Sequence, residues 1–297
     1  MSERKANICG LATIVIWFLT PLQLALVGKM PPFLIGAFSF LTAFALVLAW
    51  WVYKGEDLRE KFDMPLPAYA LGIYGIGIYN AIYIYALKTG PLLEVNLLNY
   101  LWPAFLIVFG SFLKKTRPDA PALGGIFLCF AGSYFVFESR GEISFSGSHA
   151  MLMLGVLCGV MWGSYSALLK YIRVGSDQIA VFFLLAGLLM LALHLVFEPT
   201  VWPSAPAGWI ALVCYMLGRS AFPMWNYAMK HGQARLIGSL SYFIPFFSTL
   251  ALAAAGFADF SSHNLFIGAS LIIFGCLVIN LKSLLESLPS LVRRMAV

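Results

Sequence analysis

The sequence is short of charged residues. Of its 297 residues only 11% are charged and 61% are hydrophobic, whereas an average soluble domain carries about 25% charged residues. So few charges cannot cover a water-exposed surface, which excludes an ordinary soluble domain and indicates that most of the chain lies in lipid. The net charge of +6 is dispersed, with no run of Lys or Arg, so no nucleic-acid partner is predicted.

Several chemical motifs are also absent. The five cysteines are isolated within apolar segments, which is typical of small buried side chains and not of a disulfide framework or a metal site. The sequence has no Walker motif, no HExxH or GxSxG motif and no cluster of metal ligands. We therefore expect no cofactor, no ATP-driven pumping and no enzymatic activity.

What the sequence does contain is a series of apolar segments of the length that crosses a bilayer, about 20 residues for a helix. A helix also satisfies its backbone hydrogen bonds internally, as lipid demands. We therefore predict an all-α polytopic membrane protein with ten spans. These are 8–28, 32–53, 66–87, 91–113, 120–138, 149–171, 178–198, 206–229, 234–257 and 263–285.

The basic residues are divided unequally between the loops on the two sides. Fifteen fall on the side of the N-terminus and three (Lys29, Lys88 and Arg140) on the other, while Arg219 lies within a span. By the positive-inside bias, both termini are predicted to be cytoplasmic. The first apolar run is too long for a signal peptide and is interpreted as an uncleaved helix.

A helical hairpin is repeated in the two halves of the chain. YALKTGPLLEVNLLNYLWP at 85–103 recurs as YAMKHGQARLIGSLSYFIP at 227–245, with six identical positions at a constant offset of 142. Further matches of glycine and tryptophan extend the relation to two five-helix repeats, 1–142 and 143–297. Because five is odd, the second repeat enters the membrane from the opposite face. Such inverted repeats commonly place a transporter's binding site near the midplane; a duplication kept only for packing is the alternative.

Non-aliphatic residues gather at the middle level of these spans. Arg219 is the sharpest of them, because a guanidinium that faces lipid costs roughly 3 kcal/mol or more. It is either the partner of a substrate carboxylate or a structural tie to backbone carbonyls, and Pro223 leaves such a carbonyl nearby. The two readings are weighted about equally.

The other mid-span residues are aromatic or carry an amide. Trp17 and Trp162 occupy equivalent positions in the two repeats, and they form either two walls of a ligand cavity or packing between the halves. Each tyrosine hydroxyl and the amide of Asn99 needs a partner, which could be substrate, water or a neighbouring helix. The predicted substrate-binding residues are Trp17, Tyr79, Tyr83, Asn99, Tyr100, Trp162, Arg219 and Tyr242.

Prolines occur at equivalent positions of the repeated hairpins. Pro103 and Pro245 each remove a helical hydrogen bond near mid-span, so they are predicted to act as a pair of gating kinks; fixed kinks needed for packing are at least as good a reading. Gly155, Gly159 and Gly163 form a GxxxGxxxG face, which we interpret as close helix packing.

Acidic residues are missing from the centre of every span. A proton-coupled carrier usually needs a titratable group in its pathway, so the sequence favours facilitated diffusion. Glu94, near the outer mouth of the fourth span, leaves weak coupling open. His194 lies near the outer end of the seventh span and is interpreted as a packed or capping residue.

The two hairpins, ALKTGPLLEVNLLNYLWPAF and AMKHGQARLIGSLSYFIPFF, resemble the paired EamA-like repeats of the drug/metabolite transporter superfamily, as does Trp162-Gly163. Trp17-Phe18 departs from the Trp-Gly of many relatives. The resemblance implies a basket-like fold with a central cavity and export of metabolites by alternating access. It is nearest to the branch of bacterial inner-membrane exporters for aromatic amino acids.

We therefore predict an exporter of Phe, Tyr, Trp and related metabolites, acting by uniport, with the lipid bilayer as its surroundings and no required oligomer. An aromatic ring, a carboxylate and an ammonium match the mid-span residues, although aromatic walls also suit drugs and nucleosides. The alternative is a multidrug or nucleotide-type exporter with proton coupling. A lipid-embedded scaffold or scramblase is a third reading, from another class.

Overall fold

The computed structural model describes residues 3–139, 147–172, 174–175, 178–232, 237, 240–241, 243–257, 262–279 and 281. Within these ranges all regular structure is helical, as the composition predicts. Seven stretches are long and apolar enough to cross a membrane: Glu3–Leu26, Pro32–Lys54, Leu66–Thr89, Leu92–Lys114, Ala120–Glu138, Gly147–Leu168 and Ile179–Phe197. The chain is therefore a multi-pass helical membrane protein.

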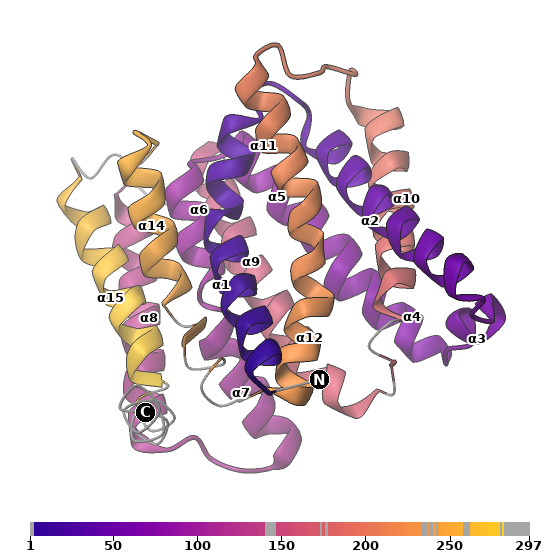
Figure 1. The fold of residues 1–297 in the computed structure, drawn as a ribbon. Coiled ribbons are helices and arrows are strands. Elements are labelled where there is room, and N and C mark those ends of the chain that lie inside the picture. The colour runs from indigo at the N-terminus through magenta and orange to yellow at the C-terminus, as the bar shows by residue number, and fades with distance from the viewer. Residues whose placement is uncertain are drawn as a thin grey trace.

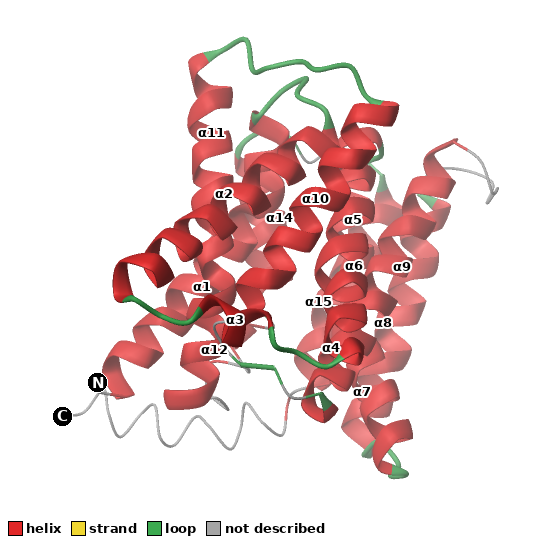
Figure 2. Cartoon of the chain, turned by 90° about the vertical axis from the view of Figure 1, so that its right-hand side faces the viewer, coloured by secondary structure: helices red, strands yellow, loops and turns green. Residues whose placement is uncertain are grey.

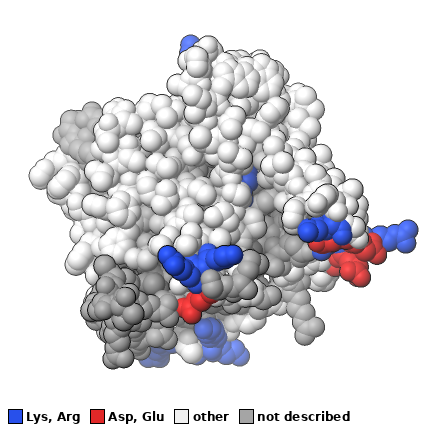
Figure 3. All heavy atoms as spheres, viewed as in Figure 1, with Lys and Arg blue, Asp and Glu red and all other residues white. Residues whose placement is uncertain are grey.

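Most of the charge on the face shown in Figure 3 lies at the margins of the molecule. Figure 3 shows acidic and basic side chains gathered along the lower edge of one face, while the band above them is almost entirely uncharged. The exposed residues include many large apolar side chains, for example Phe112, Phe127, Leu195 and Phe274. Side chains of this kind are stable at a surface that contacts lipid.

Five of the long helices are continuous. They are α1 (Glu3–Leu26), α2 (Pro32–Lys54), α8 (Ala120–Glu138), α9 (Gly147–Leu168) and α10 (Ile179–Phe197). A short helix, α3 (Leu58–Phe62), follows α2 outside the apolar band, and a 3₁₀ turn, η2 (Leu169–Tyr171), extends α9. Figure 1 shows α8, α14 and α15 on one flank and α2 and α10 on the other, with α1, α9 and α12 between them.

Other predicted spans are interrupted. The third contains α4 (Leu66–Gly72), a π-helical segment η1 (Ile73–Ile78) and α5 (Tyr79–Thr89). The eighth contains α11 (Pro206–Leu217), a 3₁₀ turn η3 (Gly218–Ser220) and α12 (Ala221–His231). In Figure 2, α11 and α12 lie at the left of the view, and α4 and α5 lie right of its centre. Departures from α-helical bonding free backbone groups and often mark functional sites.

The sequence suggested that the prolines of the repeated hairpins lie in the middle of helical spans. In the structure they lie in the first turns of shorter helices. The fourth span divides into α6 (Leu92–Asn99) and α7 (Trp102–Lys114), and Pro103 is the second residue of α7. Pro245 is likewise the second residue of α14 (Ile244–Ala254). Proline is tolerated in the first turn, where the missing N–H has no helical acceptor in any case. Each proline therefore lies in the first turn of a helix, and Pro103 closely follows the break between α6 and α7.

Glycines bring α8 and α15 (His263–Ile279) into close contact. A Cβ on Gly132 would lie 2.7 Å from the carbonyl oxygen of Gly268, and one on Gly125 would lie 2.7 Å from that of Gly275. Low residue numbers on one helix meet high numbers on the other, so the two helices run antiparallel. Only residues without side chains permit this approach.

The glycine face of α9 packs against α6 and α7. A Cβ on Gly155 would lie 2.9 Å from the carbonyl oxygen of Val95, and one on Gly163 would lie 2.9 Å from that of Trp102. This confirms the packing role predicted for the GxxxGxxxG pattern. The residue numbers rise together along this contact, so α9 runs parallel to α6 and α7.

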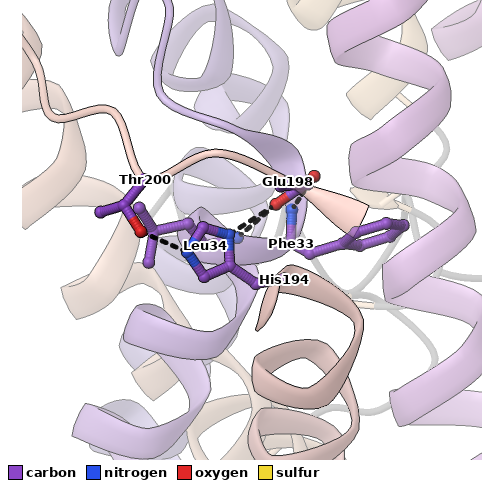
Figure 4. Close-up of polar contacts among 5 residues, drawn as sticks. All are labelled: Phe33, Leu34, His194, Glu198 and Thr200. Atoms are coloured by element: carbon purple, nitrogen blue, oxygen red, sulfur yellow. Dashed lines mark hydrogen bonds and ion pairs between the residues drawn. The ribbon is translucent and has the colours of Figure 1, made fainter. Parts of the chain in front are cut away.

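A buried polar cluster ties the end of α10 to the start of α2 (Figure 4). The backbone N–H groups of Phe33 and Leu34 donate to the two carboxylate oxygens of Glu198, at 3.1 and 3.2 Å. His194 lies between Glu198 and Thr200, with each ring nitrogen 3.0 Å from its partner oxygen. Because the N-cap residue of α2 is Pro31, which makes no side-chain cap, Glu198 supplies the missing acceptor. The prediction that His194 is packed is confirmed, because its side chain is buried and both ring nitrogens have partners.

Candidate functional site

A cavity with about 90 Å³ of free space lies where the interrupted helices meet α1 and α9. Its walls are mainly aromatic, and its polar groups are amides, hydroxyls and one guanidinium. Among the described residues none of the side chains that line it is acidic. The lining residues are Trp17, Thr20, Tyr79, Asn80, Tyr83, Asn99, Tyr100, Trp102, Trp162, Tyr215, Arg219, Phe222 and Ile244.

Three rings of one wall, Tyr79, Tyr83 and Trp162, belong to a row of four aromatic rings that continues to Tyr165 behind the cavity. Tyr83 and Tyr79 stack at 5.7 Å between centroids, Tyr79 and Trp162 lie 5.1 Å apart, and Trp162 and Tyr165 lie 5.2 Å apart. The helical spacing of Tyr79 and Tyr83 on α5 places both rings on one face. Offset and tilted contacts of this kind favour further flat aromatic partners.

A second group of rings includes Trp17 and Phe222 of the lining. Trp17 lies 5.1 Å from Trp225 and 6.0 Å from Phe222. Phe222 also contacts Trp162 at 6.2 Å. The two tryptophans singled out by the repeat therefore border the same space and are linked through Phe222.

Arg219 is the single charged residue among the described side chains of the lining. It lies on η3, is only 4% exposed, and has no ion pair among the described residues. Its guanidinium carbon is 4.4 Å from the ring centroid of Tyr215 and 4.9 Å from that of Phe40. Aromatic faces stabilise a cation by about 0.5–2 kcal/mol each, which holds the guanidinium in place but does not neutralise it.

The hydrogen bonds of Arg219 are incomplete. Nη1 donates to Asn80 Oδ1 over 3.5 Å, and Nε has no partner. Asn80 is itself held by a bond of 2.9 Å from its Nδ2 to the carbonyl of Ile76, in the π-helical segment. A buried guanidinium whose donors lack acceptors favours an incoming anion.

The other polar groups of the site are paired with one another. Tyr79 donates to Asn99 Oδ1 at 3.3 Å, and Tyr83 donates to Asn96 Oδ1 at 2.7 Å. Asn96 in turn donates to Ser248 Oγ of α14 at 2.9 Å. These bonds fix the rings of α5 against α6 and join α6 to α14.

The cavity brings together seven of the eight binding residues that the sequence predicts: Trp17, Tyr79, Tyr83, Asn99, Tyr100, Trp162 and Arg219. The eighth, Tyr242, lies outside the described residues. Pro103 and Pro245 are buried at the helix starts described above and do not line the cavity.

Sequence reasoning missed several lining residues, among them Asn80, Trp102, Tyr215 and Phe222. Three of them occupy positions that the sequence could have pointed to. Asn80 and Phe222 occupy equivalent positions of the two repeats, 142 residues apart. Tyr215 lies one helical turn before Arg219, at the spacing that places side chains on one face. Trp102 precedes Pro103 directly and gave no separate signal.

A helical membrane protein whose interrupted helices surround a polar, aromatic cavity has the architecture of a transporter. The sequence profile of the EamA-like transporter family matches residues 4–138 and again residues 149–281. The chain belongs to this family.

Characterised relatives cover nearly the whole chain. It is 34% identical over 286 residues to a protein of Ancylobacter novellus named aromatic amino acid exporter YddG, which covers 95% of this chain and 99% of the relative. Proteins of the same name from Escherichia coli and Salmonella typhimurium are 26% and 25% identical, each over 94% of this chain and 97% of the relative. A solved crystal structure with 33% sequence identity superposes with a TM-score of 0.70 over 95% of this chain and 98% of its own.

Proposed function

We propose that this protein is a secondary transporter that exports amino acids, above all the aromatic amino acids Phe, Tyr and Trp, across the bacterial inner membrane. The observation that carries the proposal is a buried guanidinium, Arg219, that has no ion pair among the described residues and whose Nε has no hydrogen-bond partner, in a cavity with aromatic walls. An aromatic amino acid supplies a ring that packs against these walls and a carboxylate, which none of the described lining residues provides. The names of the relatives from three bacteria support the same substrate class.

In this proposal the substrate carboxylate binds to the guanidinium of Arg219 and accepts a hydrogen bond from its Nε, which has no other partner. The ring inserts between Trp17 on one side and Tyr79 and Trp162 on the other. The ammonium approaches Asn99, Tyr100 or a backbone carbonyl at an interrupted helix, and Tyr242 is assigned to the same site by the repeat. Displacement of Asn80 from its long contact with Arg219 accompanies binding.

We further propose ten membrane spans in two inverted five-helix repeats, 1–142 and 143–297. The double match of the family profile supports this division. The pairing of helices supports it too. The first helix of the second half, α9, packs on α6 and α7 of the first half, and the first helix of the first half, α1, packs on α14 of the second half. The antiparallel contact of α8 with α15 relates the last helix of each half to its counterpart. In the ten-span arrangement α11 and α12 together, α14 and α15 form the eighth, ninth and tenth spans.

Export then proceeds by alternating access, with the halves moving about the interruptions of the helices. The breaks before Pro103 and Pro245 are the proposed hinges, because a chain without continuous helical bonding bends there at low cost. The contact of Asn96 with Ser248 crosses between the halves and must break when that side of the cavity opens. With no acid among the described lining residues, we propose uniport down the substrate gradient.

Flux of labelled phenylalanine in liposomes that contain the purified protein tests this proposal. Saturable flux, inhibited by excess Trp and Tyr and much less by Ala, is the expected result. The absence of saturable amino acid flux would overturn it. An imposed pH gradient that accelerates the flux would overturn uniport, and an Arg219→Ala variant that transports phenylalanine normally would favour the multidrug or nucleotide-type exporter.

A further inference from the structure

The charge of the central cavity is not matched to a zwitterion. It presents a buried cation, Arg219, that has no ion pair among the described residues, and none of the described lining residues is acidic. Glu94, the buried acid of α6, is not among the lining residues. A site adapted to both charges of an amino acid would offer an anionic partner for the ammonium, because a buried charge is costly unless it is paired.

The hydrogen-bond partners of the lining lead to the same conclusion. The amide oxygens of Asn99 and Asn96 already accept bonds from Tyr79 and Tyr83, and the oxygen of Asn80 faces Arg219. The donor of the lining that lacks an acceptor is therefore the Nε of Arg219. A carboxylate supplies that acceptor, whereas an ammonium adds a second positive charge near the guanidinium.

We infer that the transported class extends to aromatic monocarboxylates that lack the ammonium, such as aryl 2-hydroxy and 2-oxo acids, and that Arg219 excludes aromatic amines. This rests on the proposed function, since it assigns a wider substrate class to the same cavity. The ring binds between the aromatic walls as in an amino acid, the carboxylate pairs with Arg219, and the hydroxyl or oxo group replaces the ammonium.

The inference has an energetic consequence. A zwitterion carries no net charge, so its distribution does not respond to the membrane potential. A monoanion does respond, and a potential that is negative inside drives it outward. About 59 mV supports a tenfold gradient of a singly charged ion. Export of the acids is therefore driven by the potential, with no coupled proton.

Three ligands that differ in one group each provide the first test. Phenylalanine, 3-phenyllactate (hydroxyl in place of ammonium) and phenethylamine (no carboxylate) compete against labelled phenylalanine in liposomes. We expect phenyllactate to inhibit at or below the concentration that phenylalanine requires, and phenethylamine to require at least tenfold more. An amine that inhibits as well as phenyllactate would overturn the inference.

Labelled phenyllactate in vesicles with a potassium diffusion potential provides the second test. Accumulation on the positive side of the membrane, about tenfold at 59 mV, is expected with the protein and not in empty vesicles. Phenylalanine flux in the same vesicles should not respond to the potential. Phenyllactate flux that is absent, or that ignores the potential, contradicts the inference.

Variants of Arg219 connect both results to the residue. R219Q should lose discrimination between phenyllactate and phenethylamine, and R219K, which keeps the charge, should retain most of it. If R219Q does not fold, the R219K variant and the ligand series on the unmodified protein still test whether the site prefers phenyllactate to phenethylamine. A protein without any phenylalanine flux refutes the proposed function itself, whereas phenylalanine flux without competition by phenyllactate refutes only the wider substrate class.

Discussion

Trp162 is the side chain at which the aromatic groups of the cavity meet. It contacts Tyr79 and Tyr165 in the row of rings and Phe222 on the other side. Each aromatic pair contributes about 0.5–1.5 kcal/mol beyond the area that it buries. A ligand ring that inserts here exchanges some of these contacts for its own, so the size of the indole controls both packing and recognition.

Replacement of Trp162 by Ala should reduce the transport efficiency for Trp roughly tenfold or more, because about 1.4 kcal/mol of lost contact corresponds to a factor of ten. Trp162→Phe should retain more than half of the transport efficiency of the parent protein, because it keeps a ring in the wall. Trp209→Ala is the matched control, because Trp209 is exposed and stacks on Trp202 away from the cavity. Concentration-dependent flux in liposomes measures all three. Equal efficiency of Trp162→Ala and the parent protein would remove Trp162 from the site.

At the scale of the elements, close contacts between helices decide which substitutions are tolerated. The contact of α8 with α15 depends on glycine, since added Cβ atoms would lie under 3 Å from backbone oxygens of the other helix. The start of α2 depends instead on an acceptor that α10 supplies. Both contacts join segments far apart in the sequence.

Gly132→Ala should destabilise the protein by roughly 1–3 kcal/mol, the usual cost of overpacking. Gly124→Ala on the same helix is the matched control, because nothing lies within 4 Å of its added Cβ. That control should be neutral or stabilising by about 0.5–1 kcal/mol, since Ala is a better helix former. Thermal unfolding in detergent measures both. Equal melting temperatures would show that α8 and α15 can separate without loss.

Glu198→Gln should lower the free energy of unfolding by about 1 kcal/mol, because a neutral amide is a weaker partner for the first N–H groups of α2 and for His194. Glu138→Gln is the control, since Glu138 is at the end of α8 and the hydrogen bond that it accepts from Tyr134 is long, 3.5 Å. The same unfolding measurement applies. A larger effect at Glu138 than at Glu198 would contradict the capping role.

At the scale of the whole molecule, the proposed orientation follows from the distribution of basic residues and the alternation of the spans. It makes opposite predictions for two exposed loops. Thr116 lies on the loop that precedes α8, and Ser204 lies on the loop that precedes α11.

Single cysteines at these positions, in a protein whose five native cysteines have been replaced, test the orientation. Thr116→Cys should react with a membrane-impermeant maleimide only after the cells are permeabilised, and Ser204→Cys should react in intact cells with an opened outer membrane. The reverse pattern would place both termini outside and reverse the direction assigned to each repeat.

The membrane class, the predicted repeat and the level of the cavity residues can be read from the sequence alone. Hydropathy and loop charge are local sums along the chain, so span positions follow from them. Similar offsets, 145 and 142 residues, relate Trp17 and the hairpin of Tyr85 to their counterparts. That is why seven of the eight predicted binding residues border one cavity. Each of these features depends on the residues of short segments and on their positions along the chain, and not on how the helices pack.

Only the tertiary structure decided how the helices are interrupted and which polar groups remain without partners. Pro103 begins a helix because α6 ends before it, and a single-segment pattern does not distinguish a first-turn proline from a kink. Arg219 meets Asn80 at a separation of 139 residues. That no acid lies beside it among the described residues depends on every helix that surrounds it. Burial and pairing are properties of that assembly, so the anion preference of the cavity follows from the fold.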